Sequence, residues 1–146
     1  GEKKYHRMWE EAVSRYPKHV GLYLEFNEQV AHRIYAGSDF FLMPSVFEPC
    51  GLGQMIALRY GSIPIVHRTG GLADTIKLYD PVHQTGNGFL FTEYTKTSFL
   101  KAINEALRVY KNKTTMDYLL SQALRIRFSW DKSAKDYIKV YEQCFE

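Results

Sequence analysis

A short loop at residues 44–52 holds the side chains best suited to chemistry. It follows an apolar run of strand type and leads into a helical pattern. Glu48 offers carboxylate oxygens that accept hydrogen bonds from sugar hydroxyls, and the amides after it offer donors to sugar oxygens or phosphate at a helix N-terminus. Pro49 and Gly51 restrict the turn and let a ligand approach the backbone. The residues alone leave open that Glu48 only stabilises its own helix as an acidic cap.

A second loop, residues 68–71, reads Arg-Thr-Gly-Gly and again joins a strand pattern to a short helix. Paired glycines at such a turn let the backbone surround an anion, although the spacing is neither that of a Walker loop nor GxGxxG. A third candidate is Phe26, which follows another apolar run at the same predicted sheet edge. Its ring is placed either to stack on a flat base or to pack in the core.

The sequence shows no residue pattern typical of a metal site, a hydrolase or a disulfide framework. The five histidines form no i, i+4 pair and no HExxH motif, and only His67 borders the predicted ligand edge. No Gly-x-Ser-x-Gly sequence indicates a hydrolase. Cys50 and Cys144 are far apart and show no metal-ligand spacing, so neither a metal site nor a disulfide framework is predicted.

Composition is that of an ordinary globular domain. The chain has 146 residues, of which 45% are hydrophobic and 24% charged. Its net charge of +3 is small and the basic residues are scattered, which argues against a nucleic-acid partner. No apolar run is long enough for a membrane span, and no signal peptide opens the chain. The aromatic residues, 15% of the chain, are interpreted mainly as core packing.

Hydrophobic periodicity predicts an alternation of helices and strands. Strands are expected at 20–24, 40–43, 63–66 and 89–91, and helices at 2–16, 27–37, 51–60, 96–111 and 115–126, with a short helix through Ala73 and Ile76. A last helix begins near Ser129 and is expected to bury Ala134, Tyr137, Ile138 and Tyr141. Alternating units of this kind predict an α/β fold, a Rossmann-like parallel sheet with helices on both faces. Ligands of such sheets bind at the carboxyl ends of the strands, where all three candidate segments lie.

Several of these segments together resemble one family. The residues are 35–45, 47–52, Gln54, 59–61, 64–66 and 69–75, and the sequence is similar to the C-terminal domain of bacterial glycogen synthases and plant starch synthases. The resemblance is contiguous to about Thr75 and looser beyond it. It implies that residues 1–146 form a single truncated nucleotide-sugar-binding domain, part of the C-terminal domain of a GT-B fold.

The resemblance also implies an activity. The family transfers glucose from ADP-glucose, or UDP-glucose in some members, to the non-reducing end of an α-1,4-glucan, with retention of configuration and without an obligatory metal or other cofactor. By position, Glu48 resembles the glutamate that orients the glucose. The pocket wall and backbone donors correspond to Cys50, Gly51 and Leu52, the phosphate loop to Thr69 and Gly70, and the aromatic at the adenine to Phe26. A cytoplasmic location, or a plastid in a plant, is implied as well.

Two departures refine this resemblance. Many retaining GT-B enzymes carry a second Glu eight positions after the first, whereas this chain has Ile56, which matches the synthases. The family's diphosphate-binding Arg and Lys, and its N-terminal acceptor domain, would precede Gly1. Since the chain also lacks an initiator Met, it is interpreted as a fragment that is inactive alone. The strand at 20–24 is then expected to have a free edge covered by another copy, its own tail or a neighbour.

Three alternatives stay open. One is a non-catalytic GT-B-type module that binds a sugar or nucleotide. Another is a different UDP-sugar-dependent GT-B transferase, which Ile56 disfavours. The third is a phosphorylase-like enzyme, whose cofactor lysine is not evident in the sequence.

Overall fold

The computed structural model describes residues 2–145, apart from the side chain of Lys132, and divides into two compact units that meet in sequence between Ala31 and His32. The prediction that residues 1–146 form one truncated domain stays a prediction.

The first unit contains helix α1, Lys3–Arg15, which confirms the helix expected at 2–16. The strand expected at 20–24 is wrong, because this segment has no regular secondary structure. A strand needs a neighbour to take up its N–H and C=O groups, and the part of this unit that the structure describes contains no other strand. The expected covering of its free edge therefore does not arise.

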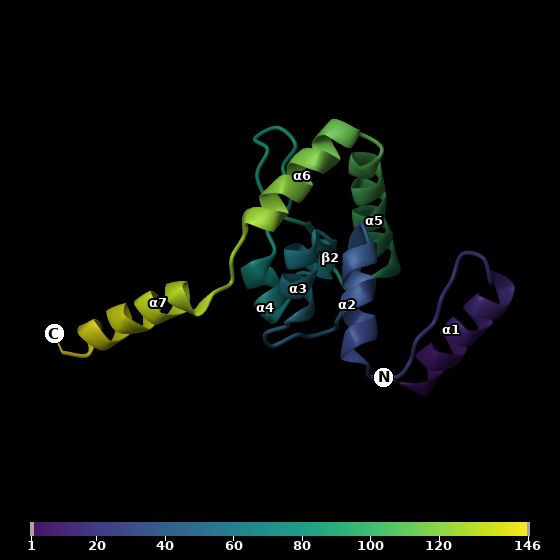
Figure 1. The fold of residues 1–146 in the computed structure, drawn as a ribbon, viewed down its shortest axis with the longest axis horizontal. Coiled ribbons are helices and arrows are strands. Elements are labelled where there is room, and N and C mark those ends of the chain that lie inside the picture. The colour runs from purple at the N-terminus through teal and green to yellow at the C-terminus, as the bar shows by residue number, and fades with distance from the viewer. Residues whose placement is uncertain (1, 146) are drawn as a thin grey trace. The chain divides into compact units, whose positions relative to one another are not determined.

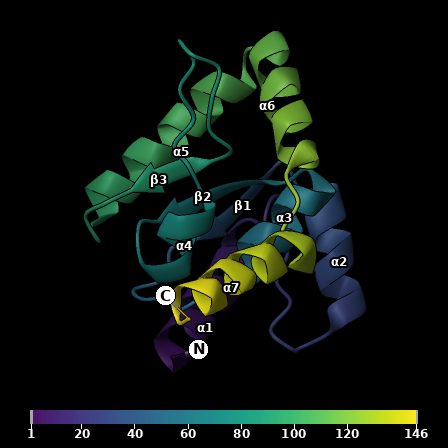
Figure 2. The same ribbon diagram turned by 90° about the vertical axis from the view of Figure 1, so that its left-hand side faces the viewer.

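The second unit is built on a parallel sheet. Helix α2, Glu28–Gly37, begins in the first unit and continues into the second, and Asn27 caps it by accepting a hydrogen bond from Val30 N at 3.0 Å. Strands β1, β2 and β3 follow in the order β1-β2-β3 (Figure 2), and Figure 1 labels the central strand β2. Their bounds are Phe40–Met43, Ile63–His67 and Phe89–Phe91. Both pairings are parallel, with Phe40 opposite Ile63 and Ile65 opposite Phe89.

Helices cover both faces of this sheet, as predicted. Successive residues of a strand point to opposite faces. Phe40 contacts Tyr110, the last residue of helix α5, whereas Phe41 contacts Tyr35 of α2 and lies close to Gly53 in helix α3. Figure 2 shows α5 and α3 on either side of the strands. The bounds are Gly53–Tyr60 for α3, Gly70–Thr75 for α4, Lys96–Tyr110 for α5 and Lys113–Arg125 for α6.

The core lies around the central strand. All residues of β2 are buried, as a strand with neighbours and helices on all sides requires. Leu58 of α3, Ala106 of α5 and Leu119 of α6 complete the buried cluster with Leu72 and Phe89. This core fixes the carboxyl ends of the strands, where the candidate loops begin.

The last helix, α7, spans Trp130–Gln143 and confirms the predicted element. The prediction that it buries Ala134, Tyr137, Ile138 and Tyr141 is wrong, because all four residues are exposed. Their spacing gives the helix an apolar face, but spacing alone cannot supply a surface to cover it. None of the helices within residues 2–145 has the length and apolar character needed to cross a bilayer.

Candidate functional site

The loops after the three strands meet at one edge of the sheet. His67, the last residue of β2, has Nδ1 2.8 Å from Ser45 O and Nε2 3.3 Å from Thr92 O. Tyr94 donates a hydrogen bond from its hydroxyl to Pro44 O at 3.1 Å. His67, the histidine that the sequence placed beside the ligand edge, thus lies between the loops that follow β1 and β3.

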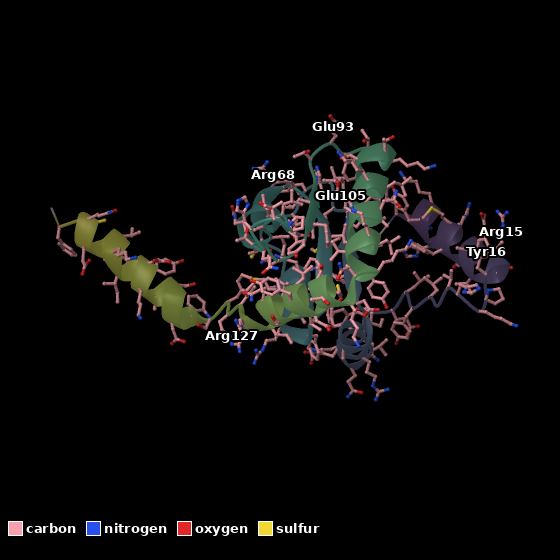
Figure 3. All side chains as sticks on the ribbon, turned by 90° about the horizontal axis from the view of Figure 1, so that it is seen from above. Arg15, Tyr16, Arg68, Glu93, Glu105 and Arg127 are labelled. Atoms are coloured by element: carbon pink, nitrogen blue, oxygen red, sulfur yellow. The ribbon has the colours of Figure 1, made fainter. Side chains whose placement is uncertain are left out.

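Charged side chains border this edge. Arg68 follows His67 directly, and its backbone N–H donates to Phe91 O at 2.9 Å. Figure 3 labels Arg68 and Glu93, which come from the loops after β2 and β3, and shows both at the margin of the molecule. Both side chains are exposed to solvent.

The two loops singled out in the sequence are in direct backbone contact. Gly71 N–H donates a hydrogen bond to Glu48 O at 3.0 Å. A Cβ atom on Gly70 would lie 2.0 Å from Glu48 O, and one on Gly71 would lie 2.1 Å from Cys50 O. Gly70 also has a φ of +41°, which favours glycine. Only residues without a side chain fit here, so the glycine pair is explained by close approach of the two loops.

Glu48 is half-buried, and within residues 2–145 its carboxylate forms no hydrogen bond. Glu48 forms no cap hydrogen bond to its own helix, because the N-cap of α3 is Leu52 and no side-chain cap bond is formed there. The carboxylate is therefore available to accept hydrogen bonds from a ligand.

The residues after Glu48 complete the loop. Cys50 is a free, exposed cysteine, Gly51 has a φ of +73°, and the side chain of Leu52 is exposed. Thr69 is the N-cap residue of α4 and Gly70 its first residue, and Gly70 lies against the backbone of Glu48 and Pro49. The structure thus brings together six of the seven predicted site residues. Their roles toward a ligand stay predictions.

Phe26 is the seventh predicted residue, and it lies in the first compact unit. Its side chain is 98% exposed, so the alternative of a core phenylalanine is wrong. Its contact with an adenine ring stays a prediction.

Sequence reasoning did not identify Gln54 as a residue that supports the loop of residues 48–52. Gln54, in the first turn of α3, is completely buried beneath residues 50 and 51 and hydrogen-bonded to Thr75 of α4. A polar residue in an otherwise apolar helical face was the available signal. Among the residues that the structure describes, no group of three or more His, Cys, Asp or Glu side chains is arranged to hold a metal ion.

A parallel sheet with two loops in contact at its carboxyl edge is typical of α/β proteins that bind a ligand at the carboxyl ends of their strands. The chain belongs to the family of glycosyl transferases group 1, whose sequence profile matches residues 2–118. It is 49% identical over 142 residues to a glycogen synthase from Kosmotoga olearia, covering 97% of this chain and 30% of that protein. It is 47% identical over 146 residues to a glycogen synthase from Bacillus cereus strain Q1, covering all of this chain and 31% of the relative.

Two solved structures are similar to this chain in fold. The catalytic domain of starch synthase IV from Arabidopsis thaliana, bound to ADP and acarbose, has a TM-score of 0.80 and 40% identity, covering 94% of this chain and 29% of that one. Sucrose-phosphate synthase from Thermosynechococcus elongatus, with a TM-score of 0.65 and 22% identity, shares the fold. The predicted GT-B-type α/β fold and the resemblance to glycogen and starch synthases are confirmed. The chain spans about 30% of the length of the curated relatives it matches.

Proposed function

We propose that the chain is the donor-binding part of a longer, retaining glucosyltransferase that makes glycogen or starch. The donor is ADP-glucose, with UDP-glucose as the alternative, and the acceptor is the non-reducing end of an α-1,4-glucan. The rest of the protein, including an N-terminal domain, supplies the acceptor side and the basic pair for the diphosphate. No metal or further cofactor takes part, and the protein works in the cytoplasm, or in a plastid if it comes from a plant.

One observation carries this proposal: the loops of residues 48–52 and 69–71 are held together by the hydrogen bond from Gly71 N–H to Glu48 O. Beside this contact lie the Glu48 carboxylate, which has no partner within residues 2–145, and the N-terminus of α3, which no side chain caps. A nucleotide sugar needs both, because its glucose presents hydroxyl donors and its diphosphate is an anion. The similarity to glycogen synthases and to a starch synthase bound to ADP supports this donor.

The mechanism that follows is electrostatic. As the bond between glucose and phosphate breaks, negative charge grows on the diphosphate. Backbone N–H groups of Gly51 and Leu52, together with the loop at Thr69 and Gly70, stabilise this charge more in the transition state than in the ground state. Glu48 accepts hydrogen bonds from the glucose hydroxyls and so positions the anomeric carbon. Cys50 and Leu52 form the pocket wall.

The experiment is glucose incorporation into glycogen by the full-length protein, with ADP-glucose and UDP-glucose compared. We expect transfer from ADP-glucose, and we expect Glu48→Ala to lower kcat by about 10²–10³, the usual loss when one transition-state contact is removed. Asp117→Asn, an exposed carboxylate on α6, is the control and is expected to retain wild-type turnover.

Two outcomes would contradict the proposal. Near-normal turnover by Glu48→Ala would remove Glu48 from the site. A folded wild-type protein that transfers glucose from neither donor would instead favour a non-catalytic binding module.

A further inference from the structure

Gln54 is a polar side chain in the core of the candidate site, with 0% of its surface exposed. Its amide nitrogen, Nε2, lies 3.2 Å from Cys50 O, 2.8 Å from Gly51 O and 3.1 Å from the hydroxyl oxygen of Thr75. A buried amide is stable only where its donors are satisfied, and this one faces three oxygen acceptors. The amide therefore contacts the first ligand loop from its inner side.

The same amide also reaches the second ligand loop through Thr75. The Thr75 hydroxyl donates its proton to Gly71 O at 2.7 Å, so this hydroxyl accepts the hydrogen bond from Gln54. A continuous chain of hydrogen bonds thus runs from the carbonyls of Cys50 and Gly51 through two side chains to Gly71. This chain of hydrogen bonds is a second link between the loops, in addition to the hydrogen bond from Gly71 N–H to Glu48 O.

Peptide geometry gives this buried network a consequence at the ligand edge. In a trans peptide the C=O of one residue and the N–H of the next point in opposite directions, and residues 2–145 contain no cis peptide bond. Because Gln54 holds the carbonyls of Cys50 and Gly51 inward, the N–H groups of Gly51 and Leu52 point away from it. Within the described chain neither N–H donates a hydrogen bond to another residue.

The oxygen of the same amide has no such partner. Gln54 Oε1 is buried, and no group of residues 2–145 donates a hydrogen bond to it. An unpaired buried oxygen is unfavourable, and a methionine of similar shape would avoid it. The amide at position 54 is therefore explained by the hydrogen bonds that its nitrogen donates to the two carbonyls rather than by packing.

We propose that Gln54 is a positioning residue for the donor diphosphate. It does not touch the ligand, but it fixes the two peptide planes so that the N–H groups of Gly51 and Leu52 are aligned on the anion before it binds. Thr75 is its partner and carries the same alignment to Gly71. The inference rests on the proposed function, because it assumes that this loop binds a nucleotide sugar.

The test is steady-state kinetics of the full-length protein with ADP-glucose and glycogen. Gln54→Met keeps the side-chain volume but removes the donor. We expect kcat, measured well below the thermal midpoint of the variant, to fall about 10- to 100-fold, the range for a small misplacement of catalytic groups, with an unchanged KM for glycogen. Gln122→Met, at a half-buried glutamine of α6, is the matched control and is expected to keep wild-type kinetics.

A second variant covers the case in which Gln54→Met does not fold. Thr75→Val keeps the shape of Thr75 and removes only its hydroxyl, and we expect a smaller fall in kcat, several-fold, again with KM for glycogen unchanged. Because both side chains act through one network, the double variant is expected to lose no more than Gln54→Met alone. A role limited to stability would give additive losses and a lower thermal midpoint.

The outcomes separate the two proposals. An active wild type with both variants within about twofold of its kcat overturns the inference and leaves the proposed function intact. Additive losses that follow the thermal midpoint also overturn it. A folded wild type that transfers glucose from neither ADP-glucose nor UDP-glucose overturns the proposed function, and the inference with it.

Discussion

Gly70 and Gly71 determine how closely the two ligand loops approach each other. Gly71 is buried, and a Cβ built on it would lie 2.6 Å from both the Cα and the carbonyl carbon of Cys50. Such contacts are with backbone, which cannot move aside as a flexible side chain does. The glycine pair that predicted an anion-binding turn therefore has a second physical role, which is to let one loop rest directly on the other.

Gly71→Ala tests this role. The added methyl group is expected to push residues 48–50 outward, to lower kcat by about 10²-fold through misplacement of Glu48, and to destabilise the fold by about 1–3 kcal/mol. Kinetics with ADP-glucose and urea unfolding measure the two effects. Gly37→Ala is the control, because a Cβ at Gly37 meets nothing within 4 Å. Equal behaviour of the two variants would show that the loops do not need this contact.

Sequence reasoning succeeded for residues whose role follows from local pattern. Glu48 and the glycine pair sit where strands end and helices begin, so topology alone placed them at one edge. The links made by Gln54 and His67 were not predicted, because they join segments 21 to 25 positions apart. Such contacts depend on how loops pack over the sheet, which hydrophobic periodicity does not describe.

Some helices are capped by a side chain at their N-terminus and others are not. Asn27 caps α2, and Asn112 caps α6 by accepting a hydrogen bond from Thr115 N at 3.1 Å. Ser129 occupies the same position before α7, but its side chain forms no cap hydrogen bond. The two caps of α6 and α7 therefore form a natural pair for a measurement.

Asn112→Ala is expected to lower the free energy of unfolding by about 0.5–2 kcal/mol, because an N–H group in the first turn of α6 loses its acceptor. Ser129→Ala is expected to change it by less than about 0.5 kcal/mol, since no hydrogen bond is lost. Urea unfolding followed by circular dichroism measures both. A loss at Ser129 as large as that at Asn112 would contradict the assignment of these caps.

The predictions were wrong for segments whose formation or burial depends on a second packing partner. Residues 20–24 carry a strand pattern but form no strand, and α7 forms without burying its apolar face. Propensity acts within a segment, whereas a strand needs a ladder and an apolar face needs a second surface. The short strands β1 to β3 were predicted correctly because each has such a partner in the described sheet.

At the scale of the whole molecule, the chain holds one side of the proposed reaction. In the proposed function Glu48 and the amides after it bind the donor, and no residue of 2–145 is assigned to the acceptor glucan. The relatives are more than three times as long as the matched region, since it makes up about 30% of each. The division between donor and acceptor therefore predicts how a truncated protein should behave.

Residues 1–146 alone are expected to transfer no glucose from ADP-glucose to glycogen, whereas the full-length protein is active. Without a second domain the acceptor is not held beside the anomeric carbon, and water is not excluded from the open loop edge. Incorporation of labelled glucose into glycogen measures both proteins. Transfer by residues 1–146 that disappears in Glu48→Ala would contradict the prediction, because that sensitivity would exclude a contaminating enzyme and place the acceptor site within this chain.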